Sequence, residues 1–150
     1  MNKNDIDHIE IAIECGGESA LSMMLHRDGT TGRSGSGSLP STDTAVLGII
    51  DQQIFKELID SLHDGVFPHA GTYEIKNKIG TPVMYRIIFL QKEETLAHFE
   101  FRFGLKNEDV GNLVSYFDGF IQHAVTLTNE WYHKTLEKKH NEDSQSGSRG

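Results

Sequence analysis

The segment from Arg27 to Thr44 contains the residues whose types and spacing most clearly suggest chemistry. Glycine, serine and threonine make up most of it, and Arg27 and Arg33 add two positive charges. Successive glycine N–H groups can form an anion-binding concavity, and arginine can donate charge-assisted hydrogen bonds to a phosphate or carboxylate. We predict that 27–44 is a flexible, solvated Gly/Ser loop. The alternative is a small-ligand site with these members: Arg27, Gly32, Arg33, Ser34, Gly35 and Gly37.

The two common nucleotide-binding motifs do not fit this segment. A phosphate-binding P-loop needs a lysine where Arg33 stands, and its leading glycine is missing. A dinucleotide fingerprint needs the spacing Gly-x-Gly-x-x-Gly and a helix directly after it, whereas the glycines here stand at Gly32, Gly35 and Gly37. Any anion site in this segment would therefore be one without a recognised motif.

Histidine, cysteine and serine residues form no catalytic or metal-binding pattern. The chain has eight histidines, but none forms the His-x-x-x-His pair that binds metals on helices. Cys15 is the only cysteine and stands close to Glu14 and Glu18, whose negative charges oppose formation of a nucleophilic thiolate. No Gly-x-Ser-x-Gly nucleophile elbow is present. We predict no catalytic residues, no metal and no cofactor, and therefore not an enzyme.

Two groups of side chains are candidates for a protein interface. Trp131 and Tyr132 stand near the end of an overlong predicted helix, and large aromatic side chains are common anchors in interfaces. His98, Glu100 and Arg102 alternate along one face of a predicted strand. The competing interpretations are that the aromatic pair closes the core against the first hairpin and that the polar strand face simply meets solvent.

Hydrophobic periodicity defines the elements that position these residues. Alternation predicts an antiparallel hairpin over 6–26, while a third strand over 45–50 stays open because periodicity alone does not settle it. Asp51 is the predicted N-cap of a helix that Gly65 terminates. Further strands are expected over 72–76, 83–90 and 95–103, and a final helix, capped by Asn107, over 108–136.

This element order predicts an α+β fold: a mostly antiparallel five- or six-stranded sheet, in the order ββ(β)αβββα, with two packed helices. The strand over 83–90 is apolar on both faces, so we expect helices on both sides of the sheet. The last helix would be about 40 Å long, more than a small sheet covers, so it either bends near Gly119 or projects. We expect a single domain over 1–136 and a disordered tail over 137–150.

Composition limits the partners and the location of the protein. The net charge of −8 argues against a nucleic-acid partner, because phosphate contacts need clustered lysine and arginine. No apolar stretch is long enough to cross a bilayer, and the N-terminus lacks the apolar core of a secretory signal. We therefore predict an acidic, cytoplasmic protein with neither a nucleic-acid nor a membrane partner.

Four short motifs accompany the predicted hairpin and the last helix: Asp28-Gly29, Arg33-x-Gly35-x-Gly37-Ser38, Gly71-x-Tyr73 and Trp131-Tyr132. With these motifs the chain resembles small, functionally uncharacterised bacterial α+β domains, some of which act as immunity proteins for secreted toxins. In element order it is also similar to profilin-like and longin domains, which serve mainly as binding and trafficking modules. The resemblance implies a bacterial binding protein and brings no active-site residues with it.

These observations together predict a non-enzymatic protein-binding module, either an adaptor or an immunity-type protein. Its acidic surface suits a basic protein partner, since complementary potentials speed association. A homodimer through the last helix is a second possible arrangement. The alternative function is a small-ligand or anion-binding domain that uses the Gly-rich segment around Arg33.

Overall fold

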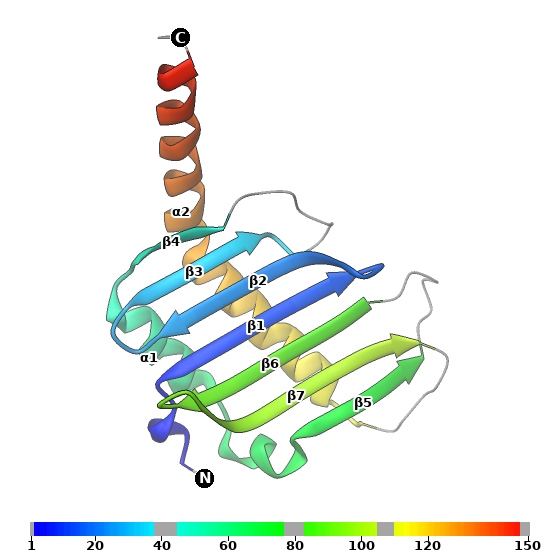
Figure 1. Ribbon diagram of the computed structural model, residues 1–150. Coiled ribbons are helices and arrows are strands. Elements are labelled where there is room, and N and C mark those ends of the chain that lie inside the picture. The colour runs from blue at the N-terminus through cyan, green and yellow to red at the C-terminus, as the bar shows by residue number, and fades with distance from the viewer. Residues whose placement is uncertain (1, 38–44, 77–82, 105–109, 148–150) are drawn as a thin grey trace.

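The computed structural model describes residues 2–37, 45–76, 83–104 and 110–147, and their elements form a single sheet with helices packed on it (Figure 1). The strands are β1 (His8–Cys15), β2 (Glu18–His26), β3 (Thr30–Gly35), β4 (Val46–Ile49), β5 (Gly71–Lys76), β6 (Val83–Gln91) and β7 (Glu94–Gly104). The α-helices are α1 (Gln52–Ser61) and α2 (Leu113–Gly147), and the short 3-10 helices are η1 (Lys3–Asp5) and η2 (Asp64–His69).

The seven strands lie in the order β4-β3-β2-β1-β6-β7-β5. Strands β1 to β4 form a meander of antiparallel neighbours, and β6 pairs antiparallel with both β1 and β7. After β4 the chain crosses beneath the sheet through α1 and η2 and enters β5 at the opposite edge, where β5 pairs parallel with β7. The predicted α+β class is confirmed, whereas the sheet has seven strands rather than five or six and is mixed.

Strand β3 accounts for the largest difference between prediction and structure. Thr30–Gly35 lies inside the segment that we expected to be a loop, and it pairs with β2 on one side and with β4 on the other. Local strand propensity is weakened by the glycines and serines of this run, but pairing along both edges overrides it. The loop prediction is therefore wrong for 30–35, the alternative strand over 45–50 is confirmed as β4, and 38–44 lies outside the described residues.

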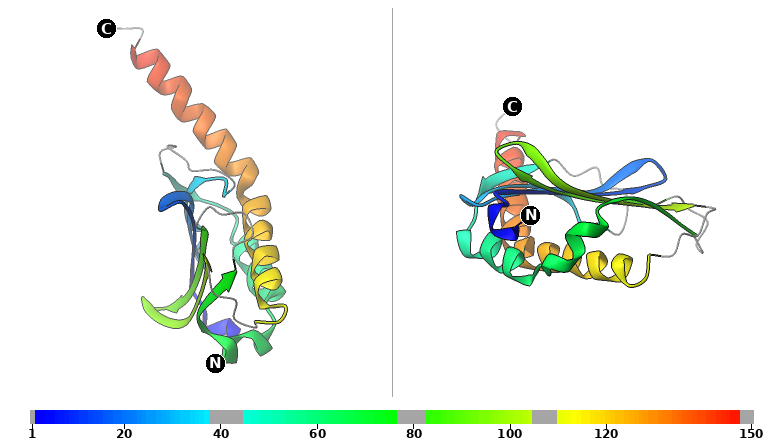
Figure 2. Two further views of the ribbon diagram at one scale, coloured as in Figure 1. Left: turned by 90° about the vertical axis from the view of Figure 1, so that its right-hand side faces the viewer. Right: turned by 90° about the horizontal axis from the view of Figure 1, so that it is seen from below.

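Both α-helices pack on the same face of the sheet (Figure 2), so the prediction of helices on both faces is wrong. The covered face holds the core, in which Phe99 and Phe117 stack with ring centroids 4.3 Å apart. On the other face of β6, Met84, Arg86 and Ile88 are only half-buried. Side chains of neighbouring strands cover half of their surface, which is enough to allow apolar residues without a second helical layer.

Helix α1 begins as its cap predicts but ends at Ser61, before the predicted stop at Gly65, and α2 begins at Leu113 rather than at 108. Asp51 is the N-cap of α1, and its side chain accepts a hydrogen bond of 2.9 Å from the backbone N–H of Gln53. Helix α2 projects past the sheet instead of bending over it (Figure 1) and continues through Gly147, into the segment 137–150 for which a disordered tail is expected. The Glu130–Lys134 ion pair, one helical turn apart at 2.7 Å, supports this extension. The predicted cap Asn107 lies outside the described residues.

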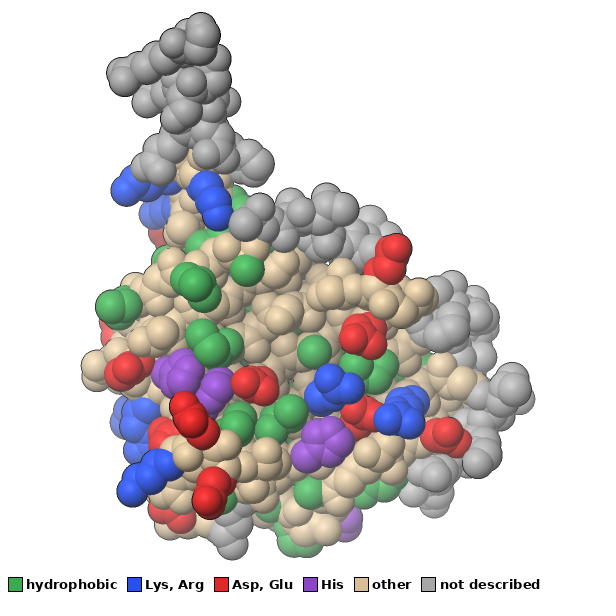
Figure 3. Space-filling model, in the orientation of Figure 1, with side chains coloured by type: hydrophobic (Ala, Val, Ile, Leu, Met, Phe, Trp, Pro, Cys, Tyr) green, Lys and Arg blue, Asp and Glu red, His purple; other side chains and the backbone are tan. Residues whose placement is uncertain are grey.

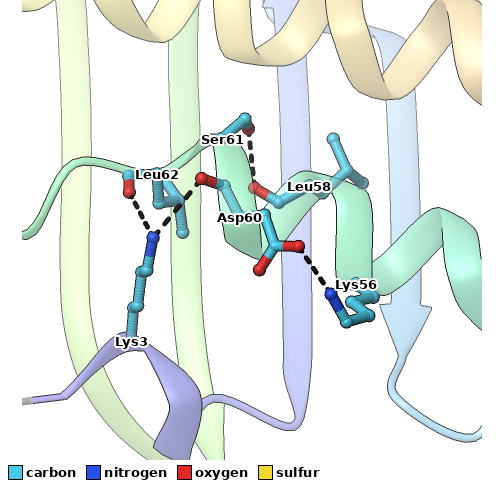
Figure 4. Close-up of polar contacts among 6 residues, drawn as sticks. All are labelled: Lys3, Lys56, Leu58, Asp60, Ser61 and Leu62. Carbon is cyan, nitrogen blue, oxygen red and sulfur yellow. Dashed lines mark hydrogen bonds and ion pairs between the residues drawn. The ribbon is translucent and has the colours of Figure 1, made fainter.

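The N-terminal segment is attached to the end of α1 by Lys3 (Figure 4). The Lys3 ammonium donates to the carbonyl oxygen of Leu62 at 2.9 Å and lies 3.4 Å from that of Asp60. These carbonyls belong to the C-terminal end of α1, where the helix dipole favours a cation. In the same turn, Lys56 and Asp60 form an exposed ion pair at 2.8 Å.

We predict that Lys3→Met lowers the free energy of unfolding by about 0.5–1 kcal/mol, because it removes the cation from the end of α1. Urea unfolding at low salt measures the loss, which should shrink in 0.5 M NaCl because salt screens the interaction. Lys56→Met is the matched control: its pair with Asp60 is exposed on both sides and should contribute little to stability. Equal losses of unfolding free energy in both variants would show that Lys3 does not stabilise the end of α1 more than an ordinary surface ion pair does.

Candidate functional site

Arg33 lies in the middle of β3 and points into the protein rather than to a ligand. Only 1% of its surface is exposed. Its Nε–H donates to the carbonyl oxygen of Gly35 at 3.0 Å, and its Nη1 donates to α2. The acceptors on α2 are the Val125 carbonyl at 3.2 Å, Thr128 Oγ1 at 3.1 Å and Asn129 Oδ1 at 2.8 Å. Arg33 therefore ties the last helix to the third strand.

Tyr132 completes this attachment from the helix side. Its ring lies beneath the Arg33 guanidinium, with 4.2 Å between the guanidinium carbon and the ring centroid, and its hydroxyl oxygen accepts from the Gly35 N–H at 2.9 Å. Burial lowers the pKa of Arg33, although Tyr132 acts in the opposite direction. Within the described residues Nη2 of Arg33 is buried without a hydrogen-bond partner. The four polar contacts and the aromatic ring compensate for removing the cation from water.

The other predicted ligand-binding residues also serve the fold. Arg27 donates to the carbonyls of Asn4 and Ile6 and lies over the Phe55 ring. At Gly32 a Cβ would lie 2.9 Å from Leu47 Cδ2, so a side chain there would displace the exposed Leu47 side chain. Ser34 pairs with β2, and Gly37 donates to the Ala20 carbonyl at 2.9 Å. The structure thus uses these residues in pairing and attachment and gives them no shared anion-binding concavity.

Arg27 does line a hollow between η1 and α1 of about 370 Å³, together with Phe55, Lys56 and Asp60. Its charged groups already have partners. Arg27 donates to backbone carbonyls, and Lys56 is paired with Asp60. The hollow therefore offers a ligand mainly apolar surface, and Nη2 of Arg27 is already engaged by backbone carbonyls.

The predicted aromatic interface is mostly internal. Tyr132 is 1% exposed and cannot be an anchor for a partner. Trp131 is half-buried, and its ring covers Gly48 of β4, where a Cβ in place of the glycine hydrogen would approach Trp131 Nε1 to 3.1 Å. The aromatic pair closes the core, as the competing interpretation held, but against β3 and β4 rather than against the first hairpin.

The predicted polar face over β6 and β7 forms an ion cluster centred on Glu100. Glu100 is 3% exposed, and Arg86 Nε and Arg102 Nε donate to its two oxygens at 2.8 and 2.6 Å. His98 Nε2 lies 3.7 Å from the same carboxylate. Burial acts to raise the pKa of Glu100, but the hydrogen bonds from the two arginines lower it below its ordinary value. The Glu100 carboxylate is satisfied, but two arginines on one carboxylate leave the cluster with a net positive charge, and Arg86, His98 and Arg102 remain partly open to solvent.

Sequence reasoning missed the apolar surface at the β4 edge. Leu47 and Ile49 are 72% and 78% exposed, and they point away from the helices. Leu47 lies over Gly32, next to Met24. We call Met24, Gly32, Leu47 and Ile49 the β4 patch; apolar side chains gather at this end of the uncovered face (Figure 3). The apolar run 45–50 was the available signal, but only the strand order shows that β4 is an edge.

A hollow of about 260 Å³ continues the β4 patch toward β1 and β6. Its floor is formed by the short side chains of Ala12 and Ser22, and Met24, Arg86 and Ile88 are among the residues of its wall. The uncovered face therefore changes from apolar at β4, through this hollow, to charged at β6 and β7. Such a surface resembles the apolar centre and polar rim of protein interfaces more than the enclosed pocket of an enzyme.

A stacked histidine pair lies on the same face at the other end of β1 and β2. The rings of His8 and His26 are 4.0 Å apart and nearly parallel. His8 Nε2 is buried, 3.5 Å from Glu10 Oε1 but without hydrogen-bond geometry. Burial lowers the pKa of His8, His26 lowers it further, and Glu10, Asp7 and Glu93 act in the opposite direction. Protonation of this pair would place two cations in contact.

Comparison of the sequence with protein-family models and with curated proteins finds no match. The resemblances to immunity-type, profilin-like and longin domains therefore stay predictions. Among the described residues, no group of three histidine, cysteine or acidic side chains is arranged to hold a metal ion. In the same part of the chain, no helix combines the length and the apolar character needed to cross a membrane.

We predict that Arg33→Ala lowers the free energy of unfolding by about 3 kcal/mol, because it removes the buried hydrogen bonds that attach α2 to β3. Arg33→Lys should recover only part of this loss, since an ammonium cannot reproduce the planar fork of the guanidinium. Urea unfolding measures the stability of both variants. Lys138→Ala, at an exposed position, is the control. An Arg33→Ala protein as stable as the control would show that the attachment is not structural.

The free energy of unfolding should fall as the pH drops below about 6.5, the ordinary pKa of histidine. Because the pKa of His8 is lowered in the folded state, the unfolded chain binds protons first and becomes favoured as the pH falls. His8→Gln should flatten this dependence between pH 7 and 5, while the exposed control His69→Gln should leave it unchanged. Urea titrations at several pH values measure the slopes. Identical slopes for wild type and His8→Gln would contradict this assignment.

Proposed function

We propose that this protein is a non-enzymatic binding module that recognises another protein through the uncovered face of its sheet. The observation that supports this most is the exposure of Leu47 and Ile49, 72% and 78%, side by side on one strand. Large apolar side chains exposed in a contiguous patch, with polar groups around them, are typical of protein interaction sites. Exposed apolar residues scattered singly over the surface would not support the proposal. Leu47 and Ile49 lie on one short strand and do support it.

The charged end of the face supports specificity for the partner. Arg86, His98 and Arg102 surround the buried Glu100 carboxylate and present their outer edges to solvent. Charges held in a fixed geometry select a partner by complementarity more than they add affinity. The net charge of −8 favours a partner whose surface is basic overall. Such a partner would suit both an immunity-type protein that binds a basic toxin and an adaptor. The alternative, anion binding around Arg33, loses support because Arg33 is buried and bound to α2.

The test is capture of partners from the lysate of the native host by chemical cross-linking, with wild type and Leu47→Ser/Ile49→Ser compared. Burial of each side chain contributes about 1.5–3 kcal/mol, so the double variant should retain less than about one tenth of the captured partner. Gln52→Ser/Gln53→Ser, at exposed positions on α1, is the matched control and should capture as much as wild type. Circular dichroism confirms that all three proteins are folded.

Two results would count against the proposal in different ways. If wild type enriches no protein over background, the protein-binding function is wrong. If the double variant captures the same partner as well as wild type does, binding occurs but does not use the β4 patch.

A further inference from the structure

Among the described residues, strand β4 presents a free hydrogen-bonding edge. It is the outermost strand of the sheet, and the Ile50 N–H donates inward to the Gly29 carbonyl at 2.9 Å. Inward and outward groups alternate along an antiparallel strand, so Gly48 and Val46 also pair inward, toward β3. The N–H and C=O groups of Leu47 and Ile49 therefore point away from the sheet. The two residues with the most exposed apolar side chains are the same two that offer outward backbone groups.

Most of the usual protections of an edge strand are missing from β4. Edge strands are commonly shielded by shortness, a lysine, a proline or a bulge. Val46–Ile49 is short, at four residues, but consists of apolar residues and one glycine and pairs with β3 without a register shift. Trp131 supports the strand from the covered face by packing on Gly48. The edge is thus held in extended geometry and left able to accept another strand.

The part of α2 that follows Tyr132 lies just beyond this edge. Figure 2 shows α2 starting on the covered face and leaning, past β4, across the plane of the sheet. Beyond β4 the helix therefore lies in the space that a second complete sheet would need in order to continue this one. Three exposed lysines, Lys134, Lys138 and Lys139, lie on this part of the helix together with the exposed Glu137. Lys134 is paired with Glu130. Blue side chains adjoin the green β4 end in Figure 3.

We propose that an extended segment of the partner protein adds to β4 as an eighth strand, and that this segment alternates apolar and acidic residues. This proposal rests on the proposed function and names the part of the partner that is recognised. The backbone groups of Leu47 and Ile49 would pair with the segment, and their side chains would contact its apolar positions. The acidic residues of the partner segment would contact the lysines of α2, even though the net charge of this protein is negative. A whole second copy is disfavoured by the direction of α2.

The test uses random peptides of about twelve residues displayed on phage and selected against the full chain, a length that covers a strand. We expect selected peptides to alternate apolar and acidic residues and to shift the amide signals of Leu47 and Ile49 in NMR spectra. Ile49→Pro removes one outward N–H while leaving the inward bonds, and proline is tolerated on edge strands. It should weaken peptide binding more than about tenfold. Ile49→Val, which retains the N–H, should stay within about threefold of wild type.

Charge reversal tests the acidic part of the proposal separately. Lys134→Glu/Lys138→Glu/Lys139→Glu should weaken binding by about tenfold at low salt, and added salt should then strengthen binding instead of weakening it, because salt screens the new repulsion. Basic or uncharged selected peptides would overturn the acidic assignment.

The remaining outcomes distinguish this inference from the proposed function. A captured partner that depends on the Leu47 and Ile49 side chains but binds Ile49→Pro as well as Ile49→Val would overturn strand addition and leave the binding function intact. Peptides whose binding does not depend on β4 would overturn it as well. Wild type that sediments as a dimer, with Ile49→Pro a monomer, would show that a second copy occupies the edge instead.

Discussion

The arrangement of this protein depends on one buried cation. Arg33 enters the covered face from β3 and bonds to α2 through Val125, Thr128 and Asn129, while Tyr132 returns a hydrogen bond to the strand. Among the described residues, this contact joins more polar groups than any other between α2 and the β4 end of the sheet. Since a buried guanidinium is unfavourable unless its donors are satisfied, α2 must lie where these acceptors are. The cation therefore specifies the direction of the helix, and with it which edge the helix passes.

That direction has consequences for the whole surface. Because α1 and α2 both pack on one face, neither helix covers the other face of the sheet (Figure 2). The β6–β7 end stabilises itself with the Glu100 ion cluster, whereas the β4 end retains exposed apolar residues. Because Trp131 packs on Gly48, β4 is supported from beneath and does not need a covering above. A strand that is rigid and bare is suited to recognition, since little ordering entropy remains to be lost on binding.

Sequence reasoning identified the elements whose own side chains define them. Alternating isoleucines predicted β1, and Asp51 predicted the start of α1, because these signals are local. It missed β3, whose glycines and serines form a strand only through neighbours on both edges. It also misassigned Arg33, because a charge can be buried only where distant groups accept its hydrogen bonds. One signal was available: Thr128, a polar residue in the apolar stripe of α2, indicated a polar partner from the sheet.

An unprotected apolar edge needs a reason to persist, because it can pair with any exposed strand and so favours aggregation. In this protein the cost is limited in three ways. The strand is only four residues long, the net charge of −8 opposes association of copies, and α2 leans across the space that a second sheet would need. None of these excludes a single extended segment. The features that limit self-association thus leave one partner geometry available, and the apolar residues of β4 are placed for that geometry.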